Sequence, residues 1–166
     1  SSAASDVYKR QFDNFDEISK ICKKYNLWLH IDGAFGGSLI FSKQHKELLR
    51  GIEKSDSFCF NAHKTLGAPL SCSILLFKND QDLLRSFDTD ANYLFQTHND
   101  KYNLGKTSLE CGRRNNALKF WTLWKSVGSI GIQNIVEKQL LISNKIKQYL
   151  SEKSEYKLIC PRYSLP

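Results

Sequence analysis

The stretch "SFCFNAHKTLGAPLSCSILLF", residues 57–77, decides the fold, because it sets a histidine and a lysine between two apolar runs. The runs "SFCF" and "SCSILLF" have the length and composition of buried strands. His63 and Lys64 fall in the short polar gap that follows the first run. A solvated surface turn is the simplest interpretation of that gap. The alternative is a lysine that binds a cofactor covalently.

The segments around this stretch alternate between helical and strand patterns. Residues 14–26 predict a helix that Asn14 caps, with Glu17 three residues later and lysines in the last turn. "LWLHI" (27–31) is a short apolar strand pattern that ends at Asp32, and residues 43–50 predict a short helix. Helices alternating with apolar strands indicate an α/β fold, with a mainly parallel sheet flanked by helices.

Further helices are predicted in the second half of the chain. Besides one in "DQDLLRSF" (80–87), a strong helix beginning near 113 ends at Gly128, with Trp121 and Trp124 on its buried side. In a last helix we expect four side chains to form the buried stripe: Ile135, Ile142, Ile146 and Tyr149.

Composition narrows the classes of function. The formal charge of +7 is carried by scattered lysines and arginines, so a basic nucleic-acid surface is not indicated. No apolar run reaches the length of a membrane span. Five cysteines without a C-x-x-C pair are typical of reduced thiols in a cytoplasmic protein, and no Cys or His pair has the spacing of metal ligands.

Both ends of the chain look cut. Residues 1–11 are small, polar and aperiodic, so we interpret them as a non-native or disordered leader outside the fold. Residues 156–166 have the pattern of a strand that stops without a partner. We therefore expect residues 12–166 to be one part of a larger domain.

The polar residues that follow the first two strand patterns suggest a common site. Ligands of open α/β sheets bind at the carboxyl ends of parallel strands, where Asp32 and the 61–64 segment would meet. Pyridoxal phosphate needs a lysine for its aldehyde and a carboxylate for its ring nitrogen. Gly33 and Ala34 would let a flat ring approach the backbone, and Asn61 and His63 could donate hydrogen bonds to a phosphate.

These motifs resemble the group II pyridoxal-phosphate amino-acid decarboxylases. In that family's signature a serine and an apolar residue precede the lysine, and spaced apolar positions and a cysteine follow it. The matching residues here are Ser57, Phe58, Lys64, Leu66, Leu70, Cys72, Leu75 and Lys78. "WLHIDGAFGG" (28–37) is similar to the family's W-L-H-V-D-A-A segment. "YLFQ" (93–96) and "LECGRRNNALKFWTLW" (109–124) look most like the branch acting on acidic amino acids, the glutamate and cysteine-sulfinate enzymes.

The resemblance implies a role for each matching residue. Lys64 would form the Schiff base with pyridoxal 5'-phosphate, and Asp32 would hold the proton of the pyridine nitrogen; these two are the candidate catalytic residues. Ala34 would contact the ring, and Asn61 and His63 would lie near the phosphate. His30 is better interpreted as a packed structural histidine, with support of Asp32 as the alternative. The chain departs from the family where Ala62 replaces a proline, Gly33 an alanine, Phe35 a larger aromatic residue and Thr65 an apolar residue.

The implied protein is a fold-type I transferase-like enzyme, a homodimer that removes the α-carboxylate of an acidic amino acid in the cytoplasm. An upstream segment and a small C-terminal domain would complete it. The implied loop with a catalytic tyrosine is expected near or beyond "YNLGK" (102–106). Three alternatives stay open: another reaction of the same cofactor (an aldehyde synthase or a lyase), a catalytically silent binding subunit, and a basic RNA-binding domain.

Overall fold

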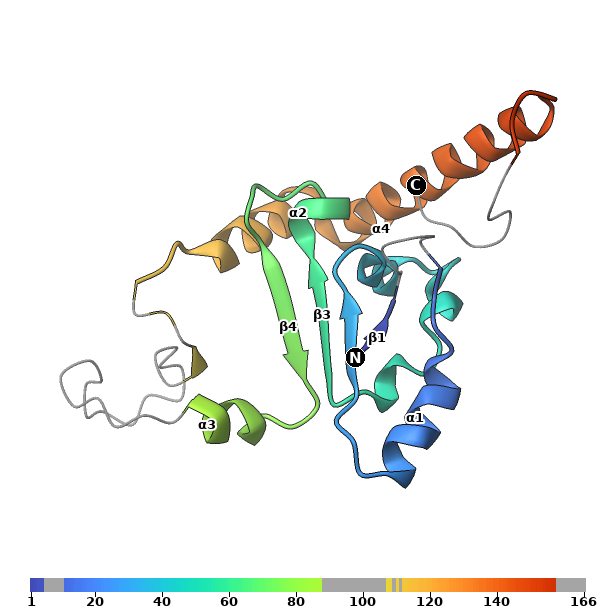
Figure 1. Ribbon diagram of the computed structural model, residues 1–166. Helices are drawn as coiled ribbons and strands as arrows, with labels where there is room; N and C mark the ends of the chain where they lie inside the picture. Colours follow the sequence, from blue (N-terminus) through green and yellow to red (C-terminus); the bar gives the residue numbers. More distant parts are fainter. Residues whose placement is uncertain (5–10, 88–106, 109, 111, 158–166) are drawn as a thin grey trace.

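The computed structural model describes residues 1–4, 11–87, 107–108, 110 and 112–157 (Figure 1). The segments predicted at 93–96, 102–106 and 158–166 lie outside the described residues. The strands are β1 Ser2–Ala3, β2 His30–Gly33, β3 Ser57–Asn61 and β4 Ser73–Phe77. The helices are α1 Phe15–Lys24, α2 Ala62–Thr65, α3 Gln81–Phe87 and α4 Asn116–Ser151, with short 3-10 turns η1 Gly36–Phe41, η2 Lys46–Leu49 and η3 Ile52–Lys54.

The sheet confirms the α/β prediction. Its order is β1-β2-β3-β4, with β1, β2 and β3 parallel and β4 antiparallel to β3. The direction of β4 follows from its connection, because a parallel crossover needs a dozen or more residues, usually with a helix. Residues 62–72 are fewer than that and contain only the one-turn helix α2. The mainly parallel sheet therefore has one antiparallel edge strand.

The first residues of the chain contribute to the sheet. Ser2 and Ala3 pair with Ile31 and Asp32 in parallel register, and Ala4 is fully buried. The carboxylate of Asp13 accepts hydrogen bonds from the Ser2 hydroxyl and the Ala3 N–H. Two residues of strand give no pattern that a sequence reading could detect, which is why this edge was not expected. Whether the leader is native stays a prediction.

Helix α1 forms as its capping signals predict. The Asn14 side chain accepts a hydrogen bond from the Glu17 N–H, and acidic residues occupy the first turn and lysines the last. Phe15 is its one fully buried side chain. Asp16 forms ion pairs with Arg50 and Lys54, which connect α1 to the turn before β3.

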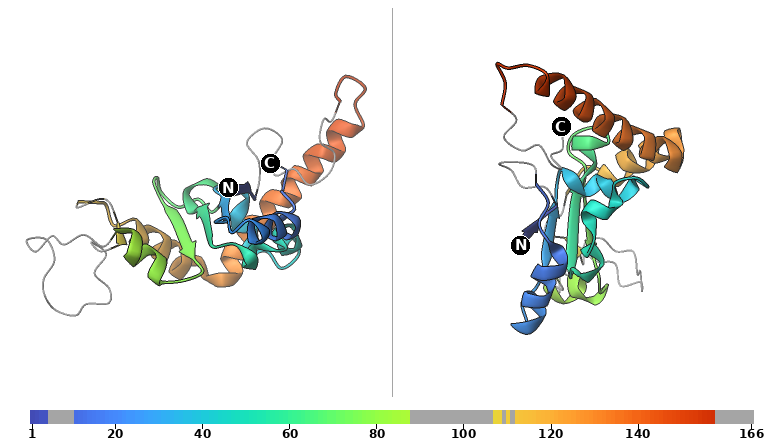
Figure 2. Two further views of the ribbon diagram at one scale, coloured as in Figure 1. Left: turned by 60° about the horizontal axis from the view of Figure 1, so that its bottom comes forward. Right: turned by 90° about the vertical axis from the view of Figure 1, so that its right-hand side faces the viewer.

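The two faces of the sheet have different surroundings. Alternation along the strands sends Ile31, Phe58 and Phe60 to one face, where they are buried in the core with Leu39 of η1 and Ile132 of α4. The opposite alternation sends Asp32, which is exposed, to the other face together with half-buried His30 and Cys59. The two further views show α4 passing the sheet and continuing well beyond it (Figure 2). No helix in the described ranges is long and apolar enough to cross a membrane.

Helix α4 differs from the prediction in which residues it buries. Gly128 does interrupt it, with φ of 68° and ψ of 177°, as its C-terminal position predicted. The expected stripe is wrong: Ile142, Ile146 and Tyr149 are exposed. The buried side chains of the second half are instead Ile132, Val136, Leu140 and Ser143.

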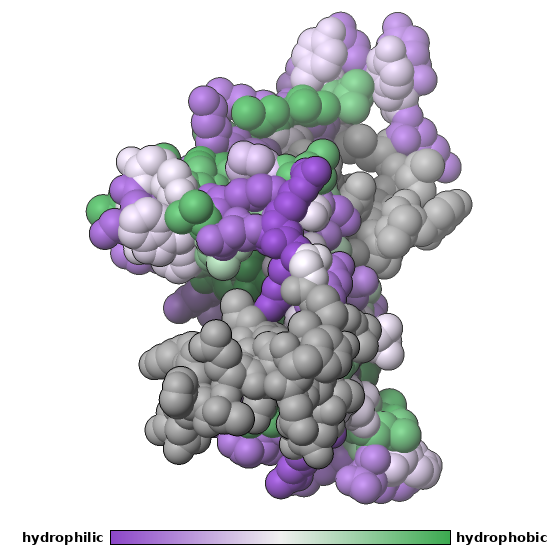
Figure 3. Space-filling model, turned by 90° about the vertical axis from the view of Figure 1, so that its left-hand side faces the viewer, coloured by the Kyte–Doolittle hydropathy of each residue, from purple (hydrophilic) through white to green (hydrophobic). Residues whose placement is uncertain are grey.

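Trp121 was expected in the core and is 59% exposed, whereas Trp124 packs edge-on against Phe41 and Phe120. Several other large apolar side chains of α4 are also exposed, among them Leu118, Ile130 and Leu141. Hydrophobic residues lie among hydrophilic ones on the face shown in Figure 3. Helix α4 thus carries apolar residues over more of its circumference than the described part of the fold buries.

Candidate functional site

The parallel pairing of β2 and β3 brings the two predicted catalytic residues to one edge of the sheet. In the register, Asp32 lies opposite Cys59 and Gly33 opposite Phe60, so both strands end at the same level. Asp32 is inside β2 rather than after it, because the strand extends to Gly33 and does not stop at Ile31. Lys64 follows β3 in the one-turn helix α2. Both side chains are exposed at this edge.

Ala34 links the ends of the two strands. Its N–H donates to Oδ1 of Asp32 at 2.9 Å, and its carbonyl accepts from the Asn61 N–H at 3.1 Å. Three of the residues predicted to contact the cofactor are therefore neighbours through backbone or side-chain hydrogen bonds. This connection fixes the chain on both sides of the edge at which a ligand would bind.

The backbone of helix α2 is fixed at Lys64, because the residues on either side of it are buried or hydrogen-bonded. Ala62 and Thr65 are buried, and the Thr65 carbonyl accepts a hydrogen bond from the Gln139 side chain of α4. Nδ1 of His63 lies 3.0 Å from both the carbonyl oxygen and the nitrogen of Cys72. With its neighbours held by α4 and by the residue before β4, the exposed Lys64 side chain projects from a fixed backbone.

The His63 contact decides which ring nitrogen can meet a ligand. Since Nδ1 is engaged with the Cys72 backbone, Nε2 is the nitrogen left for a group outside the fold. The alternative is a purely structural role, in which His63 satisfies the Cys72 carbonyl and contacts no ligand. Both interpretations of His63 place it beside Lys64 on α2.

The pKa of the Cys59 thiol is affected by both Asp32 and Lys64. Desolvation raises the pKa of its thiol above the usual value, and the nearby carboxylate of Asp32 raises it further. A backbone hydrogen bond at Gly33 and the ammonium of Lys64 act in the opposite direction. The charges of Asp32 and Lys64 therefore both act on the Cys59 thiol, in opposite directions. Cys59 was not among the predicted site residues, although strand alternation puts it on the same face as Asp32.

Gly33 is a departure from the family pattern that the packing explains. A Cβ built there would lie 2.5 Å from the Phe58 ring, 2.7 Å from the Cys59 carbonyl oxygen and 2.8 Å from Cα of Gly37. Two of these three atoms are backbone, so they cannot move aside as a side chain would. The alanine of the resembling family does not fit this chain without a shift of β2 against β3 and η1.

We predict that Gly33→Ala lowers the free energy of unfolding by about 1–3 kcal/mol, the usual cost of overpacking a filled interior. Urea unfolding of the complete protein measures it. Gly112→Ala is the matched control, because a Cβ at Gly112 meets no described atom within 4 Å. Equal midpoints for the two variants would contradict the close contact at Gly33.

Thr65, the departure next to Lys64, carries a buried hydroxyl. Its Oγ1 has no hydrogen-bond partner within the part of the chain that the structure describes. We predict that Thr65→Val raises the free energy of unfolding by about 1 kcal/mol, since it removes an unsatisfied polar atom and keeps the shape. The matched control Thr65→Ser keeps the hydroxyl, loses the methyl group and should unfold more readily than the parent. A lower thermal midpoint for Thr65→Val would show that Oγ1 has a partner.

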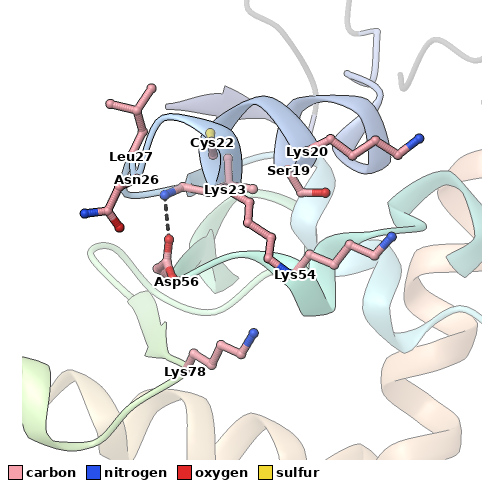
Figure 4. Close-up of a pocket in the computed structure, with 10 residues that line it drawn as sticks. Ser19, Lys20, Cys22, Lys23, Asn26, Leu27, Lys54, Asp56 and Lys78 are labelled. Atoms are coloured by element: carbon pink, nitrogen blue, oxygen red, sulfur yellow. Dashed lines mark hydrogen bonds between the residues drawn. The ribbon is translucent and has the colours of Figure 1, made fainter.

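A hollow of about 580 Å³ lies away from this site (Figure 4). It is lined by residues of α1 and the following loop, with Lys54, Asp56 and Lys78 on the opposite wall. Asp56 precedes β3 and accepts a hydrogen bond from the Leu29 N–H, whereas Asn61 ends β3. At the usual rise per residue the two are roughly 16 Å apart, so this hollow is at the other end of the sheet from Lys64.

The donor set at the carboxyl edge fits pyridoxal phosphate. An exposed carboxylate, an exposed primary amine and the polar side chains of Asn61 and His63 gather at the ends of two parallel strands. These are the groups that the cofactor's ring nitrogen, aldehyde and phosphate require. No group of three or more potential metal ligands occurs among the described residues.

A family model and curated proteins similar to this chain indicate the same family. The model of the family described as "Pyridoxal-dependent decarboxylase conserved domain" matches residues 6–165. The acidic amino acid decarboxylase GADL1 of Homo sapiens is 39% identical over 158 residues, which are 92% of this chain and 30% of that protein. GADL1 of Bos taurus has the same identity and coverage. The chain thus spans about a third of the length of the curated relatives that it matches.

Solved structures agree with the sequence comparison. The crystal structure of mouse CSAD has a TM-score of 0.84 and 30% identity, and the match covers 95% of this chain and 33% of that one. The Catharanthus roseus tryptophan decarboxylase, solved in complex with L-tryptophan, has a TM-score of 0.84 and 26% identity, over 97% of this chain and 33% of that one. The overall backbone fold of this chain is therefore similar to that of solved decarboxylases.

Proposed function

Because the chain belongs to the pyridoxal-dependent decarboxylase family, we propose that the complete protein removes the α-carboxylate of an amino acid, with glutamate or cysteine sulfinate as the substrate class. The observation that carries the proposal is the meeting of Asp32 and Lys64 at one sheet edge, in a chain 39% identical to an acidic amino acid decarboxylase. The family's cofactor is pyridoxal phosphate, as the resemblance implied.

When bound, pyridoxal phosphate supplies an aldehyde that takes up an amine and a ring that accepts the electron pair left by departing carbon dioxide. Lys64 is the amine that holds the cofactor covalently and that returns a proton to the α-carbon or releases the product. Asp32 keeps a proton on the ring nitrogen through its negative charge. Each role needs only side chains that the fold exposes at this edge.

The remaining residues bind and orient. Asn61 and His63 are proposed to donate hydrogen bonds to the phosphate, His63 through Nε2, since its Nδ1 is engaged with Cys72. Ala34 is proposed to lie against the ring, because its N–H holds Asp32 and its small side chain leaves room for a flat group. A cofactor held at three points keeps the reacting bond in one orientation.

We also propose that the complete protein is a cytoplasmic homodimer. Support comes from the exposed apolar side chains of α4, Leu118, Trp121 and Ile142 among them, which an isolated soluble surface rarely gathers on one element. Sedimentation of the complete protein tests the assembly. A monomer at micromolar concentration would contradict it.

The test of the proposed function uses the complete protein with added pyridoxal phosphate. We expect borohydride to fix a pyridoxyl adduct on the peptide that contains Lys64, detected by mass spectrometry. We expect carbon dioxide release from glutamate or cysteine sulfinate to exceed release from aromatic amino acids by at least about tenfold, which corresponds to one charge-assisted contact.

The same assays separate the alternatives. Aldehyde and peroxide in place of an amine product would identify an amine-oxidising synthase. A trapped adduct without turnover of any amino acid would identify a catalytically silent relative. Absence of an adduct on Lys64 would overturn the proposal.

A further inference from the structure

A row of hydrogen bonds on the open face of the sheet leads to Asp32. Nε1 of Trp28 donates to Oγ of Ser57 at 2.9 Å, and this Oγ lies 2.8 Å from Nδ1 of His30. Nε2 of His30 lies 3.7 Å from Sγ of Cys59, and the Cys59 thiol donates to Oδ1 of Asp32 at 3.7 Å. Five side chains from β2, β3 and the loop before β2 are thereby connected.

The chemistry of the first two members sets the direction of the row. The indole N–H of Trp28 can only donate, so Ser57 accepts from it. The buried Ser57 hydroxyl then needs an acceptor for its own proton, and Nδ1 of His30 is the acceptor beside it. With Nδ1 accepting from Ser57, the ring proton of His30 lies on Nε2, which faces Cys59.

The remaining steps continue toward the carboxylate. Sγ of Cys59 accepts from Nε2 of His30 and donates its S–H to Oδ1 of Asp32. Burial and the charge of Asp32 both raise the pKa of Cys59, so the thiol keeps the proton that it donates. The Ala34 N–H reaches the same oxygen, Oδ1. Oδ2 of Asp32 can therefore face a ligand while Oδ1 is held by two donors.

We propose that Cys59, supported by His30, is a positioning residue that fixes the carboxylate of Asp32 toward the ring nitrogen of the cofactor. The inference rests on the proposed function, because it gives Asp32 its cofactor role. It adds a role for side chains 27 and 29 residues apart in the sequence, which the register of β2 on β3 brings together. Without the thiol, Asp32 would be held by the Ala34 N–H and would sample other rotamers at an exposed position.

The first experiment needs no cofactor. The rate at which iodoacetamide alkylates Cys59 is followed by peptide mass spectrometry in the complete protein, in Asp32→Asn and in Asp56→Asn. Removal of the Asp32 charge lowers the pKa of Cys59, so Asp32→Asn should be alkylated at least about threefold faster at the same pH. Asp56→Asn makes the same chemical change at the far end of β3 and should match the parent. Equal rates for all three proteins would overturn the contact.

The second experiment uses the holoenzyme and the variants Cys59→Ala and Cys59→Ser. We expect Cys59→Ala to weaken pyridoxal phosphate binding by about 3- to 10-fold, and to shift the midpoint of the pH titration of its visible absorbance. Cys59→Ser retains a donor at this position and should restore both values to within about twofold of the parent.

The outcomes separate the two proposals. If Lys64 is trapped as expected and Cys59→Ala has the parent's titration midpoint and affinity, the positioning role is wrong and the proposed function stands. If Cys59→Ser behaves like Cys59→Ala, the role does not depend on a donor and the inference fails. If Lys64 gives no adduct, the proposed function fails, and the alkylation rates still judge the contact between Cys59 and Asp32. Urea unfolding of each variant identifies any that is not folded.

Discussion

Lys64→Ala is expected to eliminate the borohydride-stable adduct and to lower carbon dioxide release from the preferred amino acid by at least about 10³-fold. The reason is that the variant lacks the amine that holds the cofactor covalently. The backbone around it should be unaffected, because Lys64 is exposed while Ala62 and Thr65 carry the packing of α2. Visible absorbance after addition of pyridoxal phosphate and a carbon dioxide assay measure the two effects.

Lys78→Ala is the matched control, since Lys78 is also an exposed lysine that follows a strand, but at the opposite end of the sheet. It should keep the adduct and the activity of the parent. Small primary amines added to Lys64→Ala should restore part of the activity, because they supply the missing group. An unchanged adduct in Lys64→Ala would mean that another lysine holds the cofactor, and Lys64 would then be the solvated turn residue of the simplest interpretation.

Asp32→Asn is expected to lower the turnover number by about 10²–10⁴-fold while the cofactor still binds to Lys64. The variant loses the negative charge that keeps the ring nitrogen protonated, and one charge held against the reacting group contributes on this scale. The fold should survive, because the amide oxygen of asparagine can still accept from the Ala34 N–H. Single-turnover kinetics and the absorbance spectrum of the bound cofactor measure the change.

Asp56→Asn is the control for this substitution as well. Asp56 is a carboxylate that accepts from a backbone N–H, that of Leu29, and it lies at the amino end of β3. Its replacement should leave turnover within about twofold of the parent, the range expected of a residue distant from the chemistry. If Asp32→Asn retained full turnover, the ring proton would not depend on Asp32, and the inference about Cys59 would lose its basis.

Local signals predicted those elements whose stability is decided within a few residues. The cap of α1 by Asn14 and the interruption of α4 at Gly128 both follow from side-chain and backbone preferences that need no distant partner. The strand pattern of 57–60 was found for the same reason, since its buried residues come in one short run. The meeting of Asp32 with α2 followed from one general rule, that parallel strands end at the same edge.

The predictions from sequence failed where contacts with a distant element determine the structure. The edge strand at Ser2–Ala3 is too short to leave a pattern, and it exists only through its pairing with β2. The burial of α4 depends on which of its apolar faces meets η1 and the sheet. Trp121 and Ile146 have the periodicity of core residues, but both side chains are exposed in the described part of the chain.

The sequence by itself therefore determined the chemical groups of the candidate site, the family they resemble and the order of the longer helices and strands. Only the tertiary structure decided that Gly33 has no room for a methyl group, and that Ser57, His30 and Cys59 form a row ending at Asp32. The physical reason is register: these contacts join residues almost thirty positions apart, and a shift of β2 by one residue would turn each of them to the opposite face of the sheet.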